Sequence, residues 1–437
     1  MGDIKELLDE AVGSYEPRSD QRAVEERIER RKQIRRLAAG SVALALFVVA
    51  GWFAWTAFRP GEDVQTTPAG EPACPRVWRP TVSESPSGAF LSISALPDGE
   101  AWAVGPDETA PLGSETLIHR WDGSAWQRVP SPNGASGPQA VNALNDVAAI
   151  SPDDVWAVGE FVETPGWGEN PSQVLVEHWD GSAWTIEPAP SPMVRENQLN
   201  AVAAAAPNDV WAAGFAVSGH VATTLIEHWD GRAWSVAETP DLTSDQSGAS
   251  LHALEVVSST DIWAGGSQPS GGLIEHWDGT TWSVVDIPQP GDHLIVMGLD
   301  ASSASDVWAV GWTFEESAAF TMSPVVLHFD GTEWEIVDIP PGTATSVVPL
   351  AVAVAAPNDV WVTGWMGNQS TPVALALHWD GETWRYVDIG LDEGQMFGAA
   401  GADDSVWFVG RADGTFDGSG YISGDRPLAL SGDCAGT

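Results

Sequence analysis

Basic residues are scarce in this sequence of 437 residues. It contains 19 Lys and Arg against 61 Asp and Glu, and only two of the basic residues are Lys. The imbalance is confined to residues 60–437, which hold nine Arg, no Lys and 52 acidic residues, a net charge of −43. So acidic a surface repels phosphate backbones, and the composition therefore excludes DNA and RNA as partners of this part. It suits solubility outside a cell and attracts divalent cations, cationic polymers or basic proteins.

Charged residues are absent from Leu37 to Phe58, a stretch of 22 residues. As a helix this stretch is about 33 Å long, enough to cross the hydrocarbon core of a membrane. Five basic residues lie within residues 30–36 and only Arg59 follows, so the positive-inside rule places the N-terminus in the cytoplasm and the remainder outside. A cleaved signal peptide is the alternative, but it needs a shorter apolar core and a small-x-small cleavage site. We therefore expect a single-pass protein of the cell membrane.

His and Cys are absent from residues 1–36, which excludes a zinc-binding head. The segment is also too short for a packed domain. Apolar residues recur at helical spacing from Ile4 to Val12, which predicts a short amphipathic helix. Its apolar face either binds a groove on a cytoplasmic partner protein or belongs to a solvated helical stalk, and both interpretations stay open.

The rest of the chain is built from a repeat of about 50 residues. Its first element is a polar residue followed by a short apolar strand, as in Asp154–Gly159. The second is a strand, an Asp-Gly turn and another strand, as in His178–Trp184, with six clear copies and a degenerate seventh around Tyr421–Leu430. Each unit also opens with a strand of small residues. The first element occurs seven times, at Trp102, Trp156, Trp211, Trp263, Trp308, Trp361 and Trp407.

Four antiparallel strands per unit, repeated seven times, predict an all-β, seven-bladed β-propeller of four-stranded antiparallel blades. It occupies residues 76–434, after a cytoplasmic helical head (1–36), a transmembrane helix (37–58) and a Pro/Gly-rich linker (59–75). Ala-rich strands suit the crowded wall of a central channel, and Trp fills the gaps between blades. Asp-Gly between apolar runs predicts tight type I′ hairpins. A solenoid of the same units needs capping repeats, and none is evident.

These repeats carry a family resemblance over about 350 residues. The chain resembles membrane-anchored bacterial kelch-like β-propeller repeat proteins in repeat length and in the Trp that starts the fourth strand. It departs from the kelch pattern because a Gly pair closes the second strand only at Gly265-Gly266. The Trp-Asp pairs are similar to those of WD40 repeats but lack their Gly-His element, and the Asp-Gly-x-x-Trp turn lacks a residue that Asp-box hairpins have. The resemblance implies the architecture and no named subfamily.

The two cysteines flank the repeats, with Cys74 before the first unit and Cys434 after the last. In a closed ring these ends meet, and outside the membrane oxidation is permitted, so we predict a Cys74–Cys434 disulfide. Free, separate thiols are the alternative. The segment from Val77 to Val82 resembles the fourth strand of other units and is expected to complete the last blade. The alternative for this place is Leu428–Leu430.

Residue sets that propeller enzymes need are missing. A sialidase-like site requires three convergent Arg and a Tyr nucleophile, but the only loop arginines are Arg195, Arg411 and Arg426. A copper-radical oxidase requires a Tyr-Cys pair and quinone dehydrogenases often use vicinal cysteines, whereas both cysteines of this chain flank the repeats. A carboxylate pair for hydrolysis or elimination stays open because acids abound, although no spacing singles one out.

Long connections on one face of the ring are the expected place of a binding site. They follow the second strands (160–172, 215–223, 312–323) and the fourth strands (188–198, 239–250, 340–347). Exposed Trp in such loops stacks on sugars or peptides, unless it packs beneath its own loop. The predicted binding residues are Trp167, Arg195, His220, His293, Trp312 and Trp365. No cofactor or metal site is predicted, and a Ca²⁺ site at Glu160, Glu315 and Glu316 is the weaker alternative.

The sequence thus favours a non-enzymatic surface propeller that binds or senses a ligand, a glycan, a wall polymer or a protein. Two alternatives stay open. One is an extracytoplasmic carbohydrate-active enzyme that uses a carboxylate pair. The other is a regulator that signals through residues 1–36 to a cytoplasmic partner.

Overall fold

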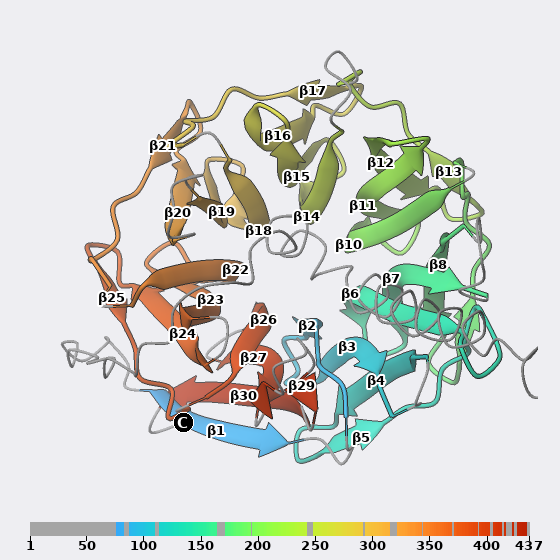
Figure 1. Ribbon diagram of the computed structural model, residues 1–437, viewed down its shortest axis with the longest axis horizontal. Coiled ribbons are helices and arrows are strands. Elements are labelled where there is room, and N and C mark those ends of the chain that lie inside the picture. The colour runs from blue at the N-terminus through green and yellow to red at the C-terminus, as the bar shows by residue number, and fades with distance from the viewer. Residues whose placement is uncertain are drawn as a thin grey trace, which may run out of the picture. The chain divides into compact units, whose positions relative to one another are not determined.

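The computed structural model shows seven four-stranded antiparallel sheets around a common axis, a seven-bladed β-propeller (Figure 1). It describes residues 76–434 apart from short gaps, so the predicted head, membrane helix and linker lie outside the described residues. Within the described residues no helix is long and apolar enough to cross a membrane. The gaps are residues 83–86, 110–112, 164–170, 194, 243–247, 292, 315–320, 343, 369–370, 392, 403–404, 413–414, 417–421 and 424–425.

Each of the first six blades consists of four consecutive strands, which follow one another from the centre of the ring outward. Blade 1 contains β2 (Ser92–Ala95), β3 (Ala101–Asp107), β4 (Glu115–Trp121) and β5 (Trp126–Arg128). Blade 2 contains β6 (Val141–Ser151), β7 (Asp154–Val162), β8 (Gln173–Trp179) and β9 (Trp184–Ile186). Blade 3 contains β10 (Glu196–Ala206), β11 (Asp209–Ser218), β12 (Val221–Trp229) and β13 (Trp234–Val236).

The next three blades repeat this order. Blade 4 contains β14 (Ser250–Ser258), β15 (Asp261–Gln268), β16 (Gly271–Trp277) and β17 (Trp282–Val284). Blade 5 contains β18 (Ile295–Ser303), β19 (Asp306–Phe314), β20 (Met322–Phe329) and β21 (Trp334–Ile336). Blade 6 contains β22 (Ser346–Ala356), β23 (Asp359–Asn368), β24 (Thr371–Trp379) and β25 (Trp384–Tyr386).

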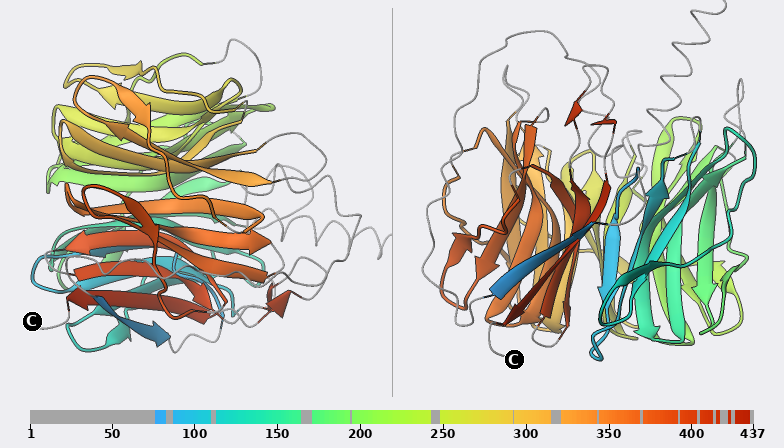
Figure 2. Two further views of the ribbon diagram at one scale, coloured as in Figure 1. Left: turned by 90° about the vertical axis from the view of Figure 1, so that its left-hand side faces the viewer. Right: turned by 90° about the horizontal axis from the view of Figure 1, so that it is seen from below.

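Blade 7 joins the two ends of the repeat region. It contains, from the centre outward, β26 (Gln395–Ala402), β27 (Ser405–Ala412), β30 (Arg426–Cys434) and β1 (Arg76–Val82). A small pair of strands, β28 (Thr415–Phe416) and β29 (Ile422–Ser423), stands beyond the blade (Figure 2).

Pairing of β1 with β30 closes the ring. The two strands run antiparallel, with Arg76 opposite Cys434 and Val82 opposite Leu428. The prediction that the segment before the first repeat completes the last blade is confirmed, whereas Leu428–Leu430 lies in the third strand. This closure excludes an open solenoid. Cys74 lies outside the described residues, so the disulfide stays a prediction.

Small residues let the innermost strands approach one another. A Cβ atom on Gly398 of β26 would lie 2.9 Å from Ser92 Cα in blade 1, and one on Gly298 of β18 would lie 3.0 Å from Ala351 Cα in blade 6. Side chains larger than hydrogen do not fit at such distances without moving a backbone. The prediction of a crowded inner wall is confirmed.

Tryptophan fills the space between neighbouring blades. The ring of Trp156 in blade 2 lies 5.1 Å from that of Trp229 and 5.5 Å from that of Trp234 in blade 3, measured between centroids. The same contact recurs one blade on, where Trp211 lies 5.2 Å from Trp277. The seven repeat tryptophans are at most 5% exposed, so they belong to the core as predicted.

The Asp-Gly turns differ from the predicted two-residue type I′ hairpins. In blade 2, Trp179 pairs with Trp184, which leaves a loop of four residues between them. The carboxylate of Asp180 accepts hydrogen bonds from the backbone N–H of Ser182 at 2.8 Å and of Ala183 at 3.0 Å. The Asp side chain itself therefore closes the longer loop, and its role is structural.

Candidate functional site

The two faces of the ring carry different connections. Turns between first and second strands and between third and fourth strands lie on one face, which we call the turn face. Connections between second and third strands, and from each blade to the next, lie on the opposite face, the loop face. Because Arg76 at the start of β1 is opposite Cys434 at the end of β30, the chain enters the ring on the turn face. The loop face is therefore the side opposite this entry point.

Five histidines, one in each of blades 2 to 6, contact an aspartate of their own blade. Nε2 of His178 lies 2.8 Å from Asp154 Oδ1, and the imidazole stacks on Trp156 with centroids 4.2 Å apart. The same contact is 2.7 or 2.8 Å long in the other four pairs, which are His228–Asp209, His276–Asp261, His328–Asp306 and His378–Asp359. These histidines fix the second strand to the third. Among the described residues, no group of three His, Cys, Asp or Glu side chains is placed to hold a metal ion.

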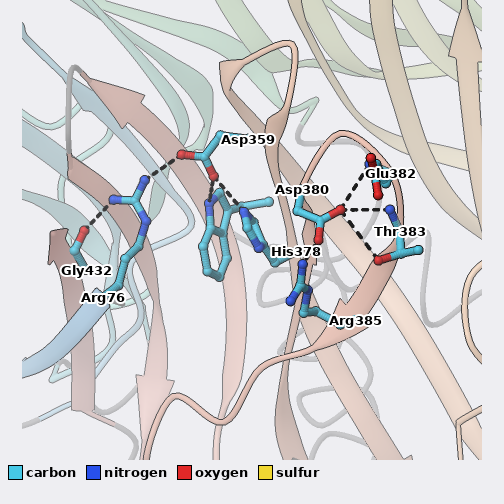
Figure 3. Close-up of polar contacts among 9 residues, drawn as sticks. Arg76, Asp359, His378, Asp380, Glu382, Thr383, Arg385 and Gly432 are labelled. Carbon is cyan, nitrogen blue, oxygen red and sulfur yellow. Dashed lines mark hydrogen bonds and ion pairs between the residues drawn. The ribbon is translucent and has the colours of Figure 1, made fainter. Parts of the chain in front are cut away.

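In two blades an arginine alters this contact between histidine and aspartate. In blade 1, Arg120 replaces the histidine, contacts Glu100 at 2.6 Å and lies over the ring of Trp102. In blade 6, Asp359 has a second partner besides its histidine, because Arg76 of β1 donates to its Oδ2 at 2.7 Å (Figure 3). The same guanidinium donates to Gly432 O at 2.8 Å, so it joins blades 6 and 7.

Two of the six predicted binding residues meet on the loop face of blade 3. Arg195, just before β10, donates through Nη1 to Gly219 O and lies 3.3 Å from Nδ1 of His220. Both side chains are exposed. The sequence predicts a variable loop at residues 215–223, but β11 and β12 pair almost throughout it and leave Gly219 and His220 as a two-residue turn. The pair thus stands on a rigid hairpin.

Trp312 and Trp365 are not available to a ligand. Their side chains are 0% and 2% exposed, because β19 and β23 extend beyond them and carry them into the sheets. The prediction that these two rings offer flat exposed faces is wrong. The ring of His293 stacks on Phe314 with centroids 4.5 Å apart. Trp167 lies outside the described residues.

The weaker Ca²⁺ alternative gains no support. Glu160 is 5% exposed, at a position where β7 still pairs with β6 and β8. Glu315 and Glu316 lie outside the described residues. The Ca²⁺ site therefore stays a prediction.

A cavity of ≈ 250 Å³ opens on the loop face of blade 3. Three segments of blade 3 line it: the connection before β10, the β11–β12 hairpin and the connection after β13. Met193, Leu225 and Leu242 give it apolar walls, while polar groups come from residues such as Thr224 and Asp241. Arg195 is two residues from Met193 and His220 is two residues from Ala222, another lining residue. The exposed pair is therefore close to the cavity in the sequence, although neither side chain lines it.

Polar side chains hold the connections that follow the fourth strands. In blades 1, 2 and 4 a side-chain oxygen of this connection accepts a hydrogen bond from a backbone N–H of the third strand. The pairs are Thr116 N to Asn133 Oδ1 at 2.9 Å, Val174 N to Ser191 Oγ at 3.1 Å and Gly272 N to Gln289 Oε1 at 2.9 Å. Blade 5 has Pro324 at the equivalent strand position, which has no N–H to donate. These bonds pin the loops of the loop face to the blades.

The innermost strands carry carboxylates that the sequence pattern did not single out. Asp146 of β6 accepts hydrogen bonds from the Ser92 hydroxyl in blade 1 and from Val202 N in blade 3, the latter at 2.7 Å. Asp300 of β18 accepts one from Val354 N in blade 6 at 2.6 Å. Burial raises the pKa of Asp146 to about 6, although its hydrogen bonds oppose the increase. Both aspartates thus tie neighbouring blades together around the channel.

Glu255 of β14 is the least compensated of these groups. Burial and the nearby charge of Asp300 together hold its pKa well above the ordinary value, and burial also raises the pKa of Asp300. On the same strand, burial lowers the pKa of His252 to about 4. Only the ring geometry reveals the pairing of the two carboxyl groups, because Glu255 and Asp300 belong to different blades.

No protein-family model matches the chain, and no curated protein matches it significantly. Several solved structures match the chain. "YCF48 bound to D1 peptide" aligns with a TM-score of 0.51 at 15% identity, over 84% of this chain and 97% of the other. YCF48 from Cyanidioschyzon merolae aligns with a TM-score of 0.51 at 13% identity, over 82% and 99%.

A third similar structure is an enzyme. A catalytically inactive variant of virginiamycin B lyase from Staphylococcus aureus, with quinupristin, aligns with a TM-score of 0.50 at 13% identity, over 82% of this chain and 99% of the other. At such low identities these likenesses establish the propeller fold alone, because propellers host both binding proteins and enzymes.

Proposed function

We propose that this protein is a non-enzymatic binding module that holds a segment of a partner protein in the blade 3 cavity of its loop face. The observation that carries the proposal is an apolar cavity whose lining residues Met193 and Ala222 each lie two positions from one member of the exposed Arg195–His220 pair. An apolar cavity with a few convergent polar groups is the usual form of a recognition site. The peptide bound to one propeller of the same fold supports this kind of ligand.

The exposed side chains favour a peptide over a sugar. Every described tryptophan is buried or half-buried, so this part of the chain offers no fully exposed indole face for sugar stacking. A cavity of ≈ 250 Å³ has room for one or two side chains of an extended segment. Arg195 then pairs with a carboxylate or carbonyl of that segment.

Net charge selects the partner at longer range. Residues 60–437 carry a net charge of −43, which draws basic proteins toward the surface. We expect a partner that is basic overall and that presents an apolar anchor beside a carboxylate or a free C-terminus.

A binding assay with a matched pair of variants tests the proposal. Residues 57–437, which form one compact unit, are probed with an array of synthetic peptides that vary in charge and in one central apolar residue. Arg195→Ala is expected to weaken the best binders about tenfold or more. Arg232→Ala makes the same charge change in the same blade, on the turn face, and is expected to leave binding unchanged. Equal effects of the two substitutions contradict the proposed site.

Anchoring in the cell membrane forms part of the proposal and rests on residues 30–59. An uncharged span of 22 residues with basic residues before it supports a cytoplasmic N-terminus and an external propeller. Protease added to intact cells is then expected to digest residues 60–437 and spare a tag at the N-terminus. Protection of the propeller in intact cells contradicts this topology.

A second candidate function is supported by Glu255 and Asp300. Two neighbouring carboxyl groups whose pKa values are both raised are typical of acid–base catalysis, here for cleavage of a polysaccharide. Release of reducing or unsaturated sugars by the purified propeller, abolished by Glu255→Gln, establishes this function. No turnover across a polysaccharide panel contradicts it.

A further inference from the structure

Three blades carry a fully buried glutamate in the third strand, directly before the histidine. Glu177, Glu227 and Glu275 are each 0% exposed. Their register is identical, since each lies opposite the Ala that follows the Trp of the second strand. In blades 5 and 6 the equivalent residues are Leu327 and Leu377. Blades 2 to 4 therefore place a glutamate where blades 5 to 7 use a leucine, and blade 1 has His119 at this position.

These carboxyl groups have almost no polar surroundings. Neither oxygen of any of the three has a hydrogen-bond partner among the described residues. The hydroxyls of Ser131, beside Glu177, and Thr224, beside Glu275, are the only groups that oppose the effect of burial, and no charged side chain contributes. Burial raises the pKa of Glu177 and Glu227 to about 8 and that of Glu275 to about 7.

The glutamates lie at the interfaces between blades. Ser131 belongs to the connection between blades 1 and 2, and Thr224 belongs to the third strand of blade 3. Residues from both sides pack together at these interfaces, as where Val174 and Val176 of blade 2 meet Trp234 of blade 3. A negative charge in such an apolar interface meets no cation, and the hydroxyls of Ser131 and Thr224 offset only part of the desolvation of Glu177 and Glu275.

We propose that the interfaces from blade 1 to blade 4 form a proton-dependent switch, which is closed while these three glutamates are protonated and loosens when they ionise. Blades 5 and 6, with leucine at the same positions, stay closed in both conditions. The loosening itself needs no ligand.

The switch also reaches the blade 3 cavity, a consequence that rests on the proposed function. Thr224 lines the cavity and neighbours Glu275, while Leu225 lines it two residues from Glu227. Ionisation therefore disturbs the cavity walls, and a ligand bound there is released as the pH rises above neutrality.

Hydrogen exchange of the full chain in detergent, followed by mass spectrometry at pH 6.5 and 8.5, tests the switch without any ligand. After correction for intrinsic rates, exchange in β8, β12 and β16 is expected to accelerate about tenfold or more at the higher pH, since one unit of pKa shift is a factor of ten. The equivalent strands β20 and β24 of blades 5 and 6 are expected to change little.

Three variants complete the test. The triple variant E177Q/E227Q/E275Q keeps the shape of the side chains without their charge and is expected to abolish the acceleration. Replacement of all three by leucine, the residue used in blades 5 and 6, gives the same expectation should the glutamine variant not fold. The triple variant E333Q/E335Q/E382Q removes three exposed carboxylates and is expected to behave as wild type. Equal acceleration in the wild type and the glutamine or leucine variant, or acceleration spread evenly over all blades, overturns the proposal. Peptide binding that persists at pH 6.5 in every variant leaves the proposed function standing whatever the exchange shows.

Discussion

Arg76 and Asp359 lie 283 positions apart in the sequence, and the guanidinium of the first donates to the carboxylate of the second at 2.7 Å. The Arg76 side chain is only 5% exposed, and Asp359 also binds His378 and the indole N–H of Trp361. The first described strand of the chain is thereby fixed to blade 6 as well as to blade 7. Arg76 is thus a second lock on the ring, independent of the β1–β30 pairing.

Removal of this lock is expected to destabilise the propeller. Arg76→Ala leaves Asp359 with one cationic partner fewer in a mostly buried place, which costs about 2–3 kcal/mol of unfolding free energy. Arg232→Ala, at an exposed turn of blade 3, makes the same charge change and is expected to cost less than about 0.5 kcal/mol. Thermal unfolding of both variants measures the difference, and equal melting temperatures for the two argue against a lock.

The two histidines of blade 3 are expected to respond in opposite ways. His228→Ala removes a 2.8 Å contact with Asp209 and a stacked ring from Trp211, so it lowers the unfolding free energy by about 1–2 kcal/mol and leaves peptide binding intact. His220→Ala, at an exposed turn, lowers peptide affinity and leaves stability intact. Thermal unfolding and binding measured on both variants check this crossover, and a loss of both properties in either variant contradicts it.

Glu255, on the innermost strand β14, is expected to make the unfolding free energy depend on pH. A carboxyl group whose pKa is raised in the folded state contributes stability at low pH, and this contribution is lost as the pH rises through the raised pKa. Glu255→Gln removes the ionisable group, so the variant is expected to exceed wild type by about 1 kcal/mol or more at pH 8 and to match it at pH 5. Denaturant unfolding at the two pH values measures this. An advantage that is the same at both pH values points to packing rather than charge.

The three glutamates at the blade interfaces, Glu177, Glu227 and Glu275, also lower the unfolding free energy as the pH rises. Between pH 7 and pH 9 their ionisation is expected to remove about 3 kcal/mol of unfolding free energy. His119 and His252, whose pKa values burial lowers to about 4, act in the opposite sense only below their unfolded value near 6.5, because there the unfolded state takes up the proton. The stability maximum is therefore expected in mild acid. A maximum at or above pH 8 contradicts these assignments.

The cysteine pair gives a covalent test of closure. Cys434 is opposite Arg76 in the β1–β30 pair, and Cys74 precedes Arg76 by two positions in the sequence, so we predict that the two cysteines form a disulfide. We expect no free thiol in the protein isolated under oxidising conditions and a loss of up to about 4–5 kcal/mol on reduction. Mass spectrometry after alkylation counts the thiols, and two alkylated cysteines contradict the pairing.

The architecture was accessible from the sequence because the repeat itself encodes it. Trp156 and its six equivalents mark the second strands. Ring closure predicts that Val77–Val82 completes the last blade. The same periodicity did not reveal which side chains face the channel or a blade interface, because both faces of an inner strand are covered in a propeller. Glu227 and Leu327 occupy equivalent positions, and nothing local marks the first as an uncompensated charge.

The remaining wrong predictions concern where strands and turns begin and end. The Gly at the end of the second strand predicts that Trp312 lies in a loop, but β19 continues to Phe314 and carries the ring into the core. The Asp-Gly turns were expected to have two residues because that dipeptide favours type I′ turns. The Asp side chain instead accepts two backbone hydrogen bonds and stabilises a four-residue loop.

Photo-crosslinking of a bound peptide locates the binding site on the propeller. A peptide selected on the array, with a photoreactive residue in place of its apolar anchor, is irradiated on the full chain and the adducts are mapped by mass spectrometry. We expect adducts on the cavity walls of blade 3, at Met193, Leu225 or Leu242, that disappear in Arg195→Ala and persist in Arg232→Ala. Adducts on the turn face, in the channel or spread over several blades would contradict the proposed site.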